Sequence, residues 1–335
     1  MTELQKVERR LVQLLVLGLL FRLLINPDQR RQYSSWISGG NLSILGLLLL
    51  LESSRSLCRT PGETCQLLTK MSWTLGNTLV QFAARGFQPK FPKWTLQFEL
   101  VRGVMRDAAT MFGDRIVDPT QAPVFRWHSE LFGSFLGWFA LRRHGLRLEP
   151  VVFKGLEHLW VKSLSASQAK KRLVVLFYHG EGYAVLSPRM YIPFCCDLLA
   201  AIQRELQSQT SDVSVELLAA NYHKIPEFLF LAPAEDAVAM YEYLLQHEKL
   251  EPSQIILAGD SAGGGLVMST LLRIRDGKST WKPRLPVPLA AIVACPLADL
   301  TGDEDPRKAS NCVLSPSIIA ASIDTYRPLG ETPRA

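Results

Sequence analysis

From residue 151 onward, the spacing of hydrophobic residues alternates between a strand pattern and a helix pattern. Runs that are apolar at nearly every position predict buried strands at residues 151–153, 158–161, 173–178, 213–220, 255–258 and 290–294. Between them, apolar residues at helical spacing predict helices at residues 190–206, 235–247 and 263–275. Buried strands joined by crossover helices are typical of a mostly parallel sheet with helices on both faces. The pattern therefore predicts an α/β fold, whose chemistry is expected in the loops at the carboxyl ends of the strands.

Two apolar stretches precede this alternation, at residues 11–25 and 36–51. At about 1.5 Å per residue, either stretch reaches roughly 24 Å as a helix, which is short of a hydrocarbon core of about 30 Å. Arginine pairs at residues 9–10 and 30–31 flank the first stretch and favour a signal anchor or an interfacial helical hairpin. We therefore expect residues 1–57 to form an apolar, membrane-associated helical segment. The alternative is a pair of ordinary helices that cover a core or a substrate entrance.

Residues 58–150 show a mixed helical pattern that is rich in aromatic side chains. This pattern predicts a helical cap or connector that leads into an α/β core at residues 151–335, and the alternative is a plain helical extension. Because the aromatic residues between Trp73 and Phe139 are numerous, we expect them to line an acyl or sterol pocket.

The net charge of +6 is concentrated near the N-terminus, since residues 1–60 hold eight Lys and Arg against four Asp and Glu. The remainder is nearly balanced and contains no basic repeat or zinc-finger spacing. Nucleic acid is therefore not expected as a partner. The six cysteines also lack the spacing of metal ligands, so they predict no metal site.

The segment Gly259-Asp260-Ser261-Ala262-Gly263 lies where a strand pattern becomes a helix pattern. A tight strand-to-helix turn strains the backbone of its serine, and glycines at positions 259 and 263 remove Cβ atoms that would collide with neighbouring backbone. The hydroxyl is then exposed at a helix N-terminus, where the helix dipole favours developing negative charge. This serine turn predicts Ser261 as a nucleophile. The alternative is a serine that only caps the helix.

A second motif, His179-Gly180-Glu181-Gly182, directly follows the strand predicted at residues 173–178. This glycine loop can aim the backbone N–H groups of Gly180 and Glu181 at the space above Ser261, where they would form an oxyanion hole with the N–H of Ala262. We expect His179 to hold the loop by hydrogen bonds rather than to act as a general base. The Glu181 carboxylate would weaken the oxyanion hole unless its side chain turns away.

These motifs resemble the hormone-sensitive-lipase-like branch of the α/β-hydrolases, which includes arylacetamide and steryl acetyl deacetylases. The resemblance covers about residues 173–326. It rests on the glycine loop (HGGG in the family), on the serine turn with Gly264 (GDSAGG), and on residues 295–301, Cys-Pro-Leu-Ala-Asp-Leu-Thr (SPWxDLT). It implies hydrolysis of small or lipid-like carboxylic esters through an acyl-serine intermediate, without a metal or an organic cofactor. The family's membrane-anchored deacetylases also agree with a membrane-associated N-terminus, and we expect the endoplasmic reticulum as its location.

The triad acid and base cannot be assigned. In this family the nucleophile is followed in the chain by an acidic residue and then by a histidine. None of the 74 residues after Ser261 is histidine, and Asp299 and Asp303 come too early to be the acid. The resemblance thus implies a hydrolase core without its C-terminal part, which ends in an exposed apolar edge at residues 290–294. We do not expect efficient hydrolysis, and the alternative function is a catalytically incomplete remnant or a ligand-binding pseudo-enzyme.

Overall fold

The computed structural model describes residues 57–164, 171–209, 213–228, 230–277, 284–300 and 311–327. The chain divides into two compact units, Met1–Ser54 and Arg55–Ala335, and every described residue belongs to the second. The apolar helical segment predicted for residues 1–57 therefore lies outside the described residues, apart from Leu57. In the part of the chain that is described, no helix combines the length and the apolar character that crossing a membrane requires.

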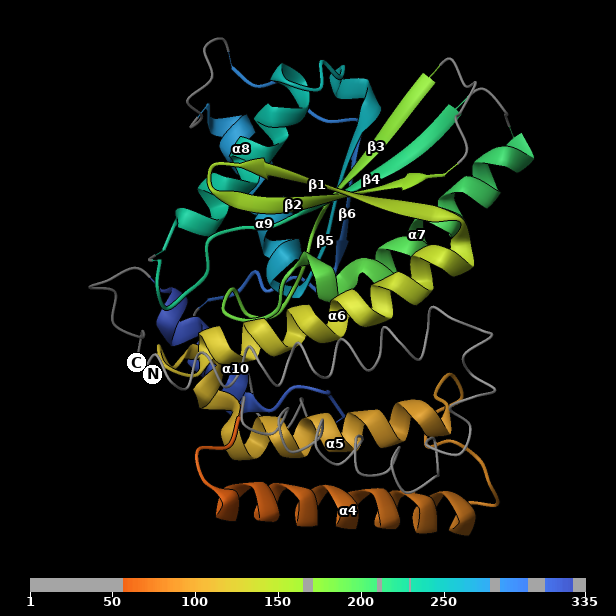
Figure 1. The fold of residues 1–335 in the computed structure, drawn as a ribbon, viewed down its shortest axis with the longest axis vertical. Helices are drawn as coiled ribbons and strands as arrows, with labels where there is room; N and C mark the ends of the chain where they lie inside the picture. The colour runs from red at the N-terminus through yellow and green to blue at the C-terminus, as the bar shows by residue number, and fades with distance from the viewer. Residues whose placement is uncertain are drawn as a thin grey trace, which may run out of the picture. The chain divides into compact units, whose positions relative to one another are not determined.

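Within the described residues, six strands form one mixed sheet in the order β1-β2-β4-β3-β5-β6 (Figure 1). The strands are β1 (Leu146–Phe153), β2 (Leu156–Ser163), β3 (Lys171–Tyr178), β4 (Val213–Ala220), β5 (Ile255–Asp260) and β6 (Ala290–Ala294). Pairing is parallel from β4 through β3 and β5 to β6, whereas β2 pairs antiparallel with both β1 and β4. The predicted α/β class and mostly parallel sheet are confirmed, with an antiparallel hairpin at one edge.

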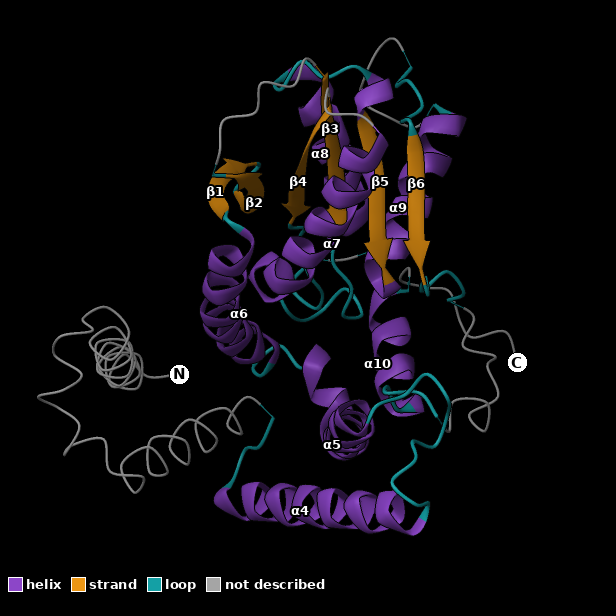
Figure 2. Ribbon diagram, turned by 90° about the vertical axis from the view of Figure 1, so that its right-hand side faces the viewer, coloured by secondary structure: helices purple, strands orange, loops and turns teal. Residues whose placement is uncertain are grey.

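Different helices cover the two faces of the sheet (Figure 2). They are α6 (Ala122–His144), α7 (Pro188–Gln209), α8 (Ala232–Gln246) and α9 (Ser261–Asp276). α7 packs on one face with α6 behind it, and α8 and α9 pack on the other. Side chains of β3 alternate between the faces, since Val175 and Phe177 join the α7 side while Leu176 and Tyr178 join the side of α8 and α9. Burial on both faces explains why β3 is apolar at each of these positions.

Further helices precede the sheet in the chain, where the sequence predicts a cap or connector. α4 (Pro61–Ala84) packs on α5 (Leu96–Phe112), and α5 contacts α10 (Pro316–Tyr326) from the far end of the sequence (Figure 2). α4 starts at a favourable cap, because the Thr60 hydroxyl oxygen accepts the N–H of Glu63 and a proline follows Thr60. Few side chains of α4 are buried, and its Trp73 is 71% exposed.

The edge strand β6 differs from the strands beside it. It pairs with β5 along its whole length, yet all five of its residues are exposed, including Ile292 and Val293. Among the described residues no further strand pairs with its outer edge. This is the exposed apolar edge that the sequence predicts for residues 290–294.

Candidate active site

Ser261 lies at the junction of β5 and α9 with a backbone φ of 49°. A positive φ is rare for a residue with a side chain, and such strain persists only where the surrounding structure holds it in place. Ser261 is half-buried, and no described residue forms a hydrogen bond with its Oγ. The structure therefore gives Ser261 the strained conformation that the sequence predicts, with a hydroxyl group that is not engaged elsewhere in the described part of the chain.

The glycines of the serine turn are required by close backbone contacts. A Cβ atom on Gly259 would lie 2.5 Å from the carbonyl oxygen of Gly263. A Cβ atom on Gly263 would overlap the carbonyl oxygen of Tyr178 at the end of β3. Since real Cβ atoms do not approach other atoms so closely, any side chain at either position would force the turn away from β3.

The glycine loop runs directly beside Ser261. β3 and β5 are neighbours in parallel register, with Tyr178 opposite Gly259, so the loop and the serine turn leave the sheet at the same level. A Cβ atom on Gly180 would lie 3.1 Å from the Cβ atom of Ser261. Glu181 has a φ of 91°, so the loop is also strained, whereas the φ of 62° at Gly182 is one that glycine adopts readily.

The structure brings the three predicted oxyanion donors to one place but leaves one of them engaged. The N–H of Gly180 donates to Oδ1 of Asp260 at 3.1 Å instead of pointing freely at the space above Ser261. Ala262 is buried in the first turn of α9, where backbone N–H groups have no partner within the helix. An oxyanion beside Ser261 could therefore use the N–H of Gly180 only after Asp260 releases it.

Tyr191, which the sequence reasoning did not select, joins the loop to the serine turn. Its hydroxyl oxygen on α7 lies 3.1 Å from Oδ2 of Asp260 and 3.4 Å from Oε1 of Glu181. Burial and the neighbouring Asp260 raise the pKa of Glu181 to about 7, and burial also raises the pKa of Asp260. The available signal was weak, because it consisted only of a tyrosine between the apolar residues Met190 and Ile192, and the hydroxyl of a buried tyrosine needs a partner.

Known proteins resemble the part of the chain that contains these motifs. Residues 175–334 match a protein family whose description is alpha/beta hydrolase fold. An acetyl-hydrolase of Streptomyces hygroscopicus is 34% identical over 156 residues, and the human hormone-sensitive lipase is 27% identical over 118 residues. These similarities support the resemblance of this chain to the hormone-sensitive-lipase-like α/β-hydrolases. The match contains both the serine turn and the glycine loop, on which the resemblance depended.

The similarity covers only part of each relative. The acetyl-hydrolase match takes in 45% of this chain and 46% of the relative. The putative acetyl-hydrolase LipR of Mycobacterium tuberculosis is 26% identical over 62% of this chain and 58% of its own length. The chain therefore spans about half the length of these curated relatives. A crystal structure of a mutant esterase superposes with a TM-score of 0.51 and 25% identity, over 74% of this chain and 72% of that one.

No histidine of this α/β-hydrolase is hydrogen-bonded to Ser261 in the described residues, which include all six. His179 holds the glycine loop, because its Nδ1 lies 2.9 Å from the carbonyl oxygen of Gly180 and its ring stacks on Tyr222. Burial lowers the pKa of His179 well below its usual value, so the ring is neutral. The other five contact groups away from the serine turn: His128 with Val124, His144 with Asp197, His158 with Asn221, His223 with Asp236 and His247 with Tyr243.

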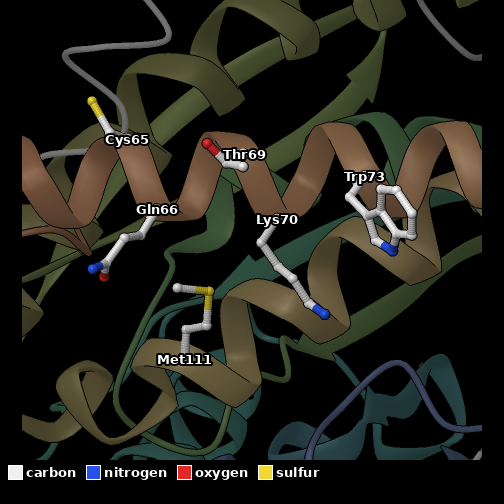
Figure 3. Close-up of a pocket in the computed structure, with 6 residues that line it drawn as sticks. All are labelled: Cys65, Gln66, Thr69, Lys70, Trp73 and Met111. Atoms are coloured by element: carbon white, nitrogen blue, oxygen red, sulfur yellow. The ribbon is translucent and has the colours of Figure 1, made fainter.

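An apolar groove lies on the outer helices rather than at Ser261. Its volume is about 750 Å³, and its walls come from α4 and α5 (Figure 3). The lining residues are Cys65, Gln66, Thr69, Lys70, Trp73 and Met111. Trp73 thus lines a groove as the sequence predicts, but the groove contains no residue of the glycine loop or serine turn. A role for the segment between Trp73 and Phe139 in binding an acyl or sterol group stays a prediction.

Metal ligands are not clustered in the described ranges, where no group of three or more His, Cys, Asp or Glu side chains could hold an ion.

Proposed function

We propose that this α/β-hydrolase is a serine ester hydrolase that forms an acyl intermediate on Ser261. The observation that carries the proposal is the strained Ser261, with its hydroxyl unengaged among the described residues and the glycine loop beside it. The names of the relatives support this function, since they include acetyl-hydrolases and lipases. Small or lipid-like carboxylic esters are the proposed substrates.

The proposed reaction begins with attack of Ser261 Oγ on the ester carbonyl carbon. The carbonyl oxygen becomes an oxyanion, which accepts hydrogen bonds from the N–H groups of Ala262 and Glu181 at the N-terminus of α9 and in the glycine loop. Collapse of this intermediate expels the alcohol and leaves the acyl group on Ser261, and water then releases the acid. Both steps need a group that accepts and returns a proton, and no described histidine contacts Ser261. We therefore expect slow turnover.

Association of residues 1–57 with a membrane, in the endoplasmic reticulum, is a further part of the proposal. Its support is the sequence alone, in the apolar stretches at residues 11–25 and 36–51 and the arginine pairs beside the first. Fractionation of cells that express the full chain tests it. Recovery in the membrane pellet after an alkaline carbonate wash is expected, and full release into the supernatant would contradict it.

Hydrolysis of p-nitrophenyl acetate tests the catalytic proposal. We expect an initial release of about one p-nitrophenol per chain, followed by slower turnover, because the acyl-enzyme forms faster than water removes the acyl group. Ser261→Ala should lose both phases, whereas the matched control Ser269→Ala on the same helix should keep them. Equal rates for the wild type and a folded Ser261→Ala variant would reject the proposal and favour the ligand-binding alternative.

A further inference from the structure

Three oxygen-bearing side chains from different elements meet beside Ser261. Glu181 comes from the glycine loop after β3, Tyr191 from the first turn of α7, and Asp260 from the end of β5. The Tyr191 hydroxyl oxygen lies 3.1 Å from one oxygen of Asp260 and 3.4 Å from one oxygen of Glu181. The second oxygen of Asp260 accepts the N–H of Gly180. This trio therefore connects the glycine loop to the residue that precedes Ser261.

The number of available protons limits how the trio can be bonded. A tyrosine hydroxyl has one proton, so Tyr191 can donate to Asp260 or to Glu181 but not to both. The shorter distance assigns that proton to Asp260. The contact with Glu181 can then be a hydrogen bond only if Glu181 carries a proton and donates it to the tyrosine oxygen. Two ionised carboxylates would leave this contact without a proton and would repel each other.

The other titratable groups around the trio provide no compensating positive charge. Those packed against it among the described residues are His179, Tyr222 and Cys195, which burial keeps neutral by lowering the pKa of His179 and raising those of Tyr222 and Cys195. Lys224 is a further titratable group nearby, whose pKa burial lowers to about 7. Its Nζ lies 4.8 Å from the centre of the Tyr222 ring and donates to Oδ1 of Asn221. The charge of Lys224 lowers the pKa of His179, and it does not contribute to the pKa of Glu181 or Asp260.

We propose that the carboxyl groups of Glu181 and Asp260 hold one proton between them, in addition to the hydroxyl proton of Tyr191, and that this carboxyl proton holds the glycine loop against the serine turn. The effect on Ser261 rests on the function proposed above. Glu181 is then a positioning residue that works in its protonated form. The hydrogen bonds run from Glu181 to Tyr191 and from Tyr191 to Asp260, which also binds the N–H of Gly180.

Loss of the shared proton has two consequences at the site. The hydrogen bond from Glu181 to Tyr191 disappears, which frees a loop whose backbone is strained at Glu181. A negative charge also appears on the loop that is proposed to stabilise an oxyanion, where it opposes the charge that develops in the reaction. Because the pKa of Glu181 is raised to about 7, both changes fall in the neutral range of pH.

A stability measurement tests proton sharing without any assumption about catalysis. The folded chain keeps the Glu181 proton up to about pH 7, whereas an unfolded chain releases it near pH 4.5, so folding binds a proton between these values. The free energy of unfolding of the wild type should therefore fall relative to Glu181→Gln as the pH rises through this window. Glu235→Gln, whose side chain is 60% exposed on α8, should show no such trend against the wild type. A constant difference between the wild type and Glu181→Gln would overturn the proposal.

The rate of Ser261 modification by a fluorophosphonate then tests the effect on the site. Glutamine keeps a donor for Tyr191 and has no charge at any pH, so Glu181→Gln serves as the reference rate at each pH. Between about pH 6 and pH 9 the rate for the wild type relative to Glu181→Gln should fall by roughly tenfold, which is the effect of losing one hydrogen bond. A ratio that does not change with pH would contradict the loop-holding role. Absence of modification in every variant would reject the hydrolase function, while the stability measurement would still decide whether the proton is shared.

Discussion

The serine turn and the glycine loop leave neighbouring strands at the same level, yet they are held in opposite ways. The turn is fixed by backbone contacts that leave no room for side chains, as the collisions expected at Gly259 and Gly263 show. The loop is fixed by polar side chains, since Asp260 binds the N–H of Gly180 and Tyr191 lies between Asp260 and Glu181. Packing does not depend on pH, whereas hydrogen bonds between carboxyl groups do. We therefore expect the loop to respond to protons and the turn not to.

The largest effect is expected when a side chain is added to the serine turn. Gly263→Val places a Cβ atom onto the carbonyl oxygen of Tyr178, so the turn must separate from β3. We expect the free energy of unfolding to drop by about 3 kcal/mol or more, because backbone cannot move aside as a flexible side chain can. Chemical denaturation measures the change. Gly76→Ala is the control, since its Cβ atom meets nothing within 4 Å on α4, and it should stabilise the chain by up to about 1 kcal/mol.

A smaller effect is expected from a methyl group on the loop. In Gly180→Ala the new Cβ atom lies 2.6 Å from Oδ2 of Asp260, so the carboxylate must turn and weaken its hydrogen bonds with Tyr191 and residue 180. We expect a loss of about 1–2 kcal/mol in unfolding free energy and roughly tenfold slower fluorophosphonate modification of Ser261. If Gly180→Ala destabilises the chain as strongly as Gly263→Val does, the loop is held by packing and the contrast with the turn fails.

The smallest effect is expected from removing one hydroxyl group. Tyr191→Phe keeps the ring but removes the link between Asp260 and Glu181. We expect a loss of about 1 kcal/mol in unfolding free energy, which is typical of a single hydrogen bond. The pH dependence of Ser261 modification should also change, because Glu181 then has no hydroxyl group to which it can donate a hydrogen bond. An unaltered pH dependence in Tyr191→Phe would show that the tyrosine hydroxyl does not link Glu181 to Asp260.

Local patterns in the sequence were sufficient for most of the fold. The bounds predicted for β4 and β6 agree with the structure, because short, mostly apolar runs followed by Asn221 and by Cys295-Pro296 mark a strand and its end. β1 begins at Leu146, five residues before the predicted start, because a half-exposed edge strand includes polar residues that hide it. α10 was not predicted, although Pro316 stands in its first turn, since one short amphipathic stretch gives a weak signal.

The candidate site was less predictable than the fold. Ser261 and the glycine loop carry their own motifs, so each was found from adjacent residues. The bond between Gly180 and Asp260 joins residues 80 positions apart, and Tyr191 reaches Asp260 across 69 positions. Contacts of that kind depend on how β3, β5 and α7 are placed in three dimensions, and no local pattern encodes them.

The central claim is that Ser261 is a nucleophile held ready by the serine turn. The most direct test is to expose the folded full-length chain to a fluorophosphonate probe and to locate the adduct by mass spectrometry of its peptides. The account predicts one adduct, on Ser261, that is absent from Ser261→Ala and present in Ser269→Ala. A wild-type chain that unfolds cooperatively but carries no adduct on Ser261 would contradict it.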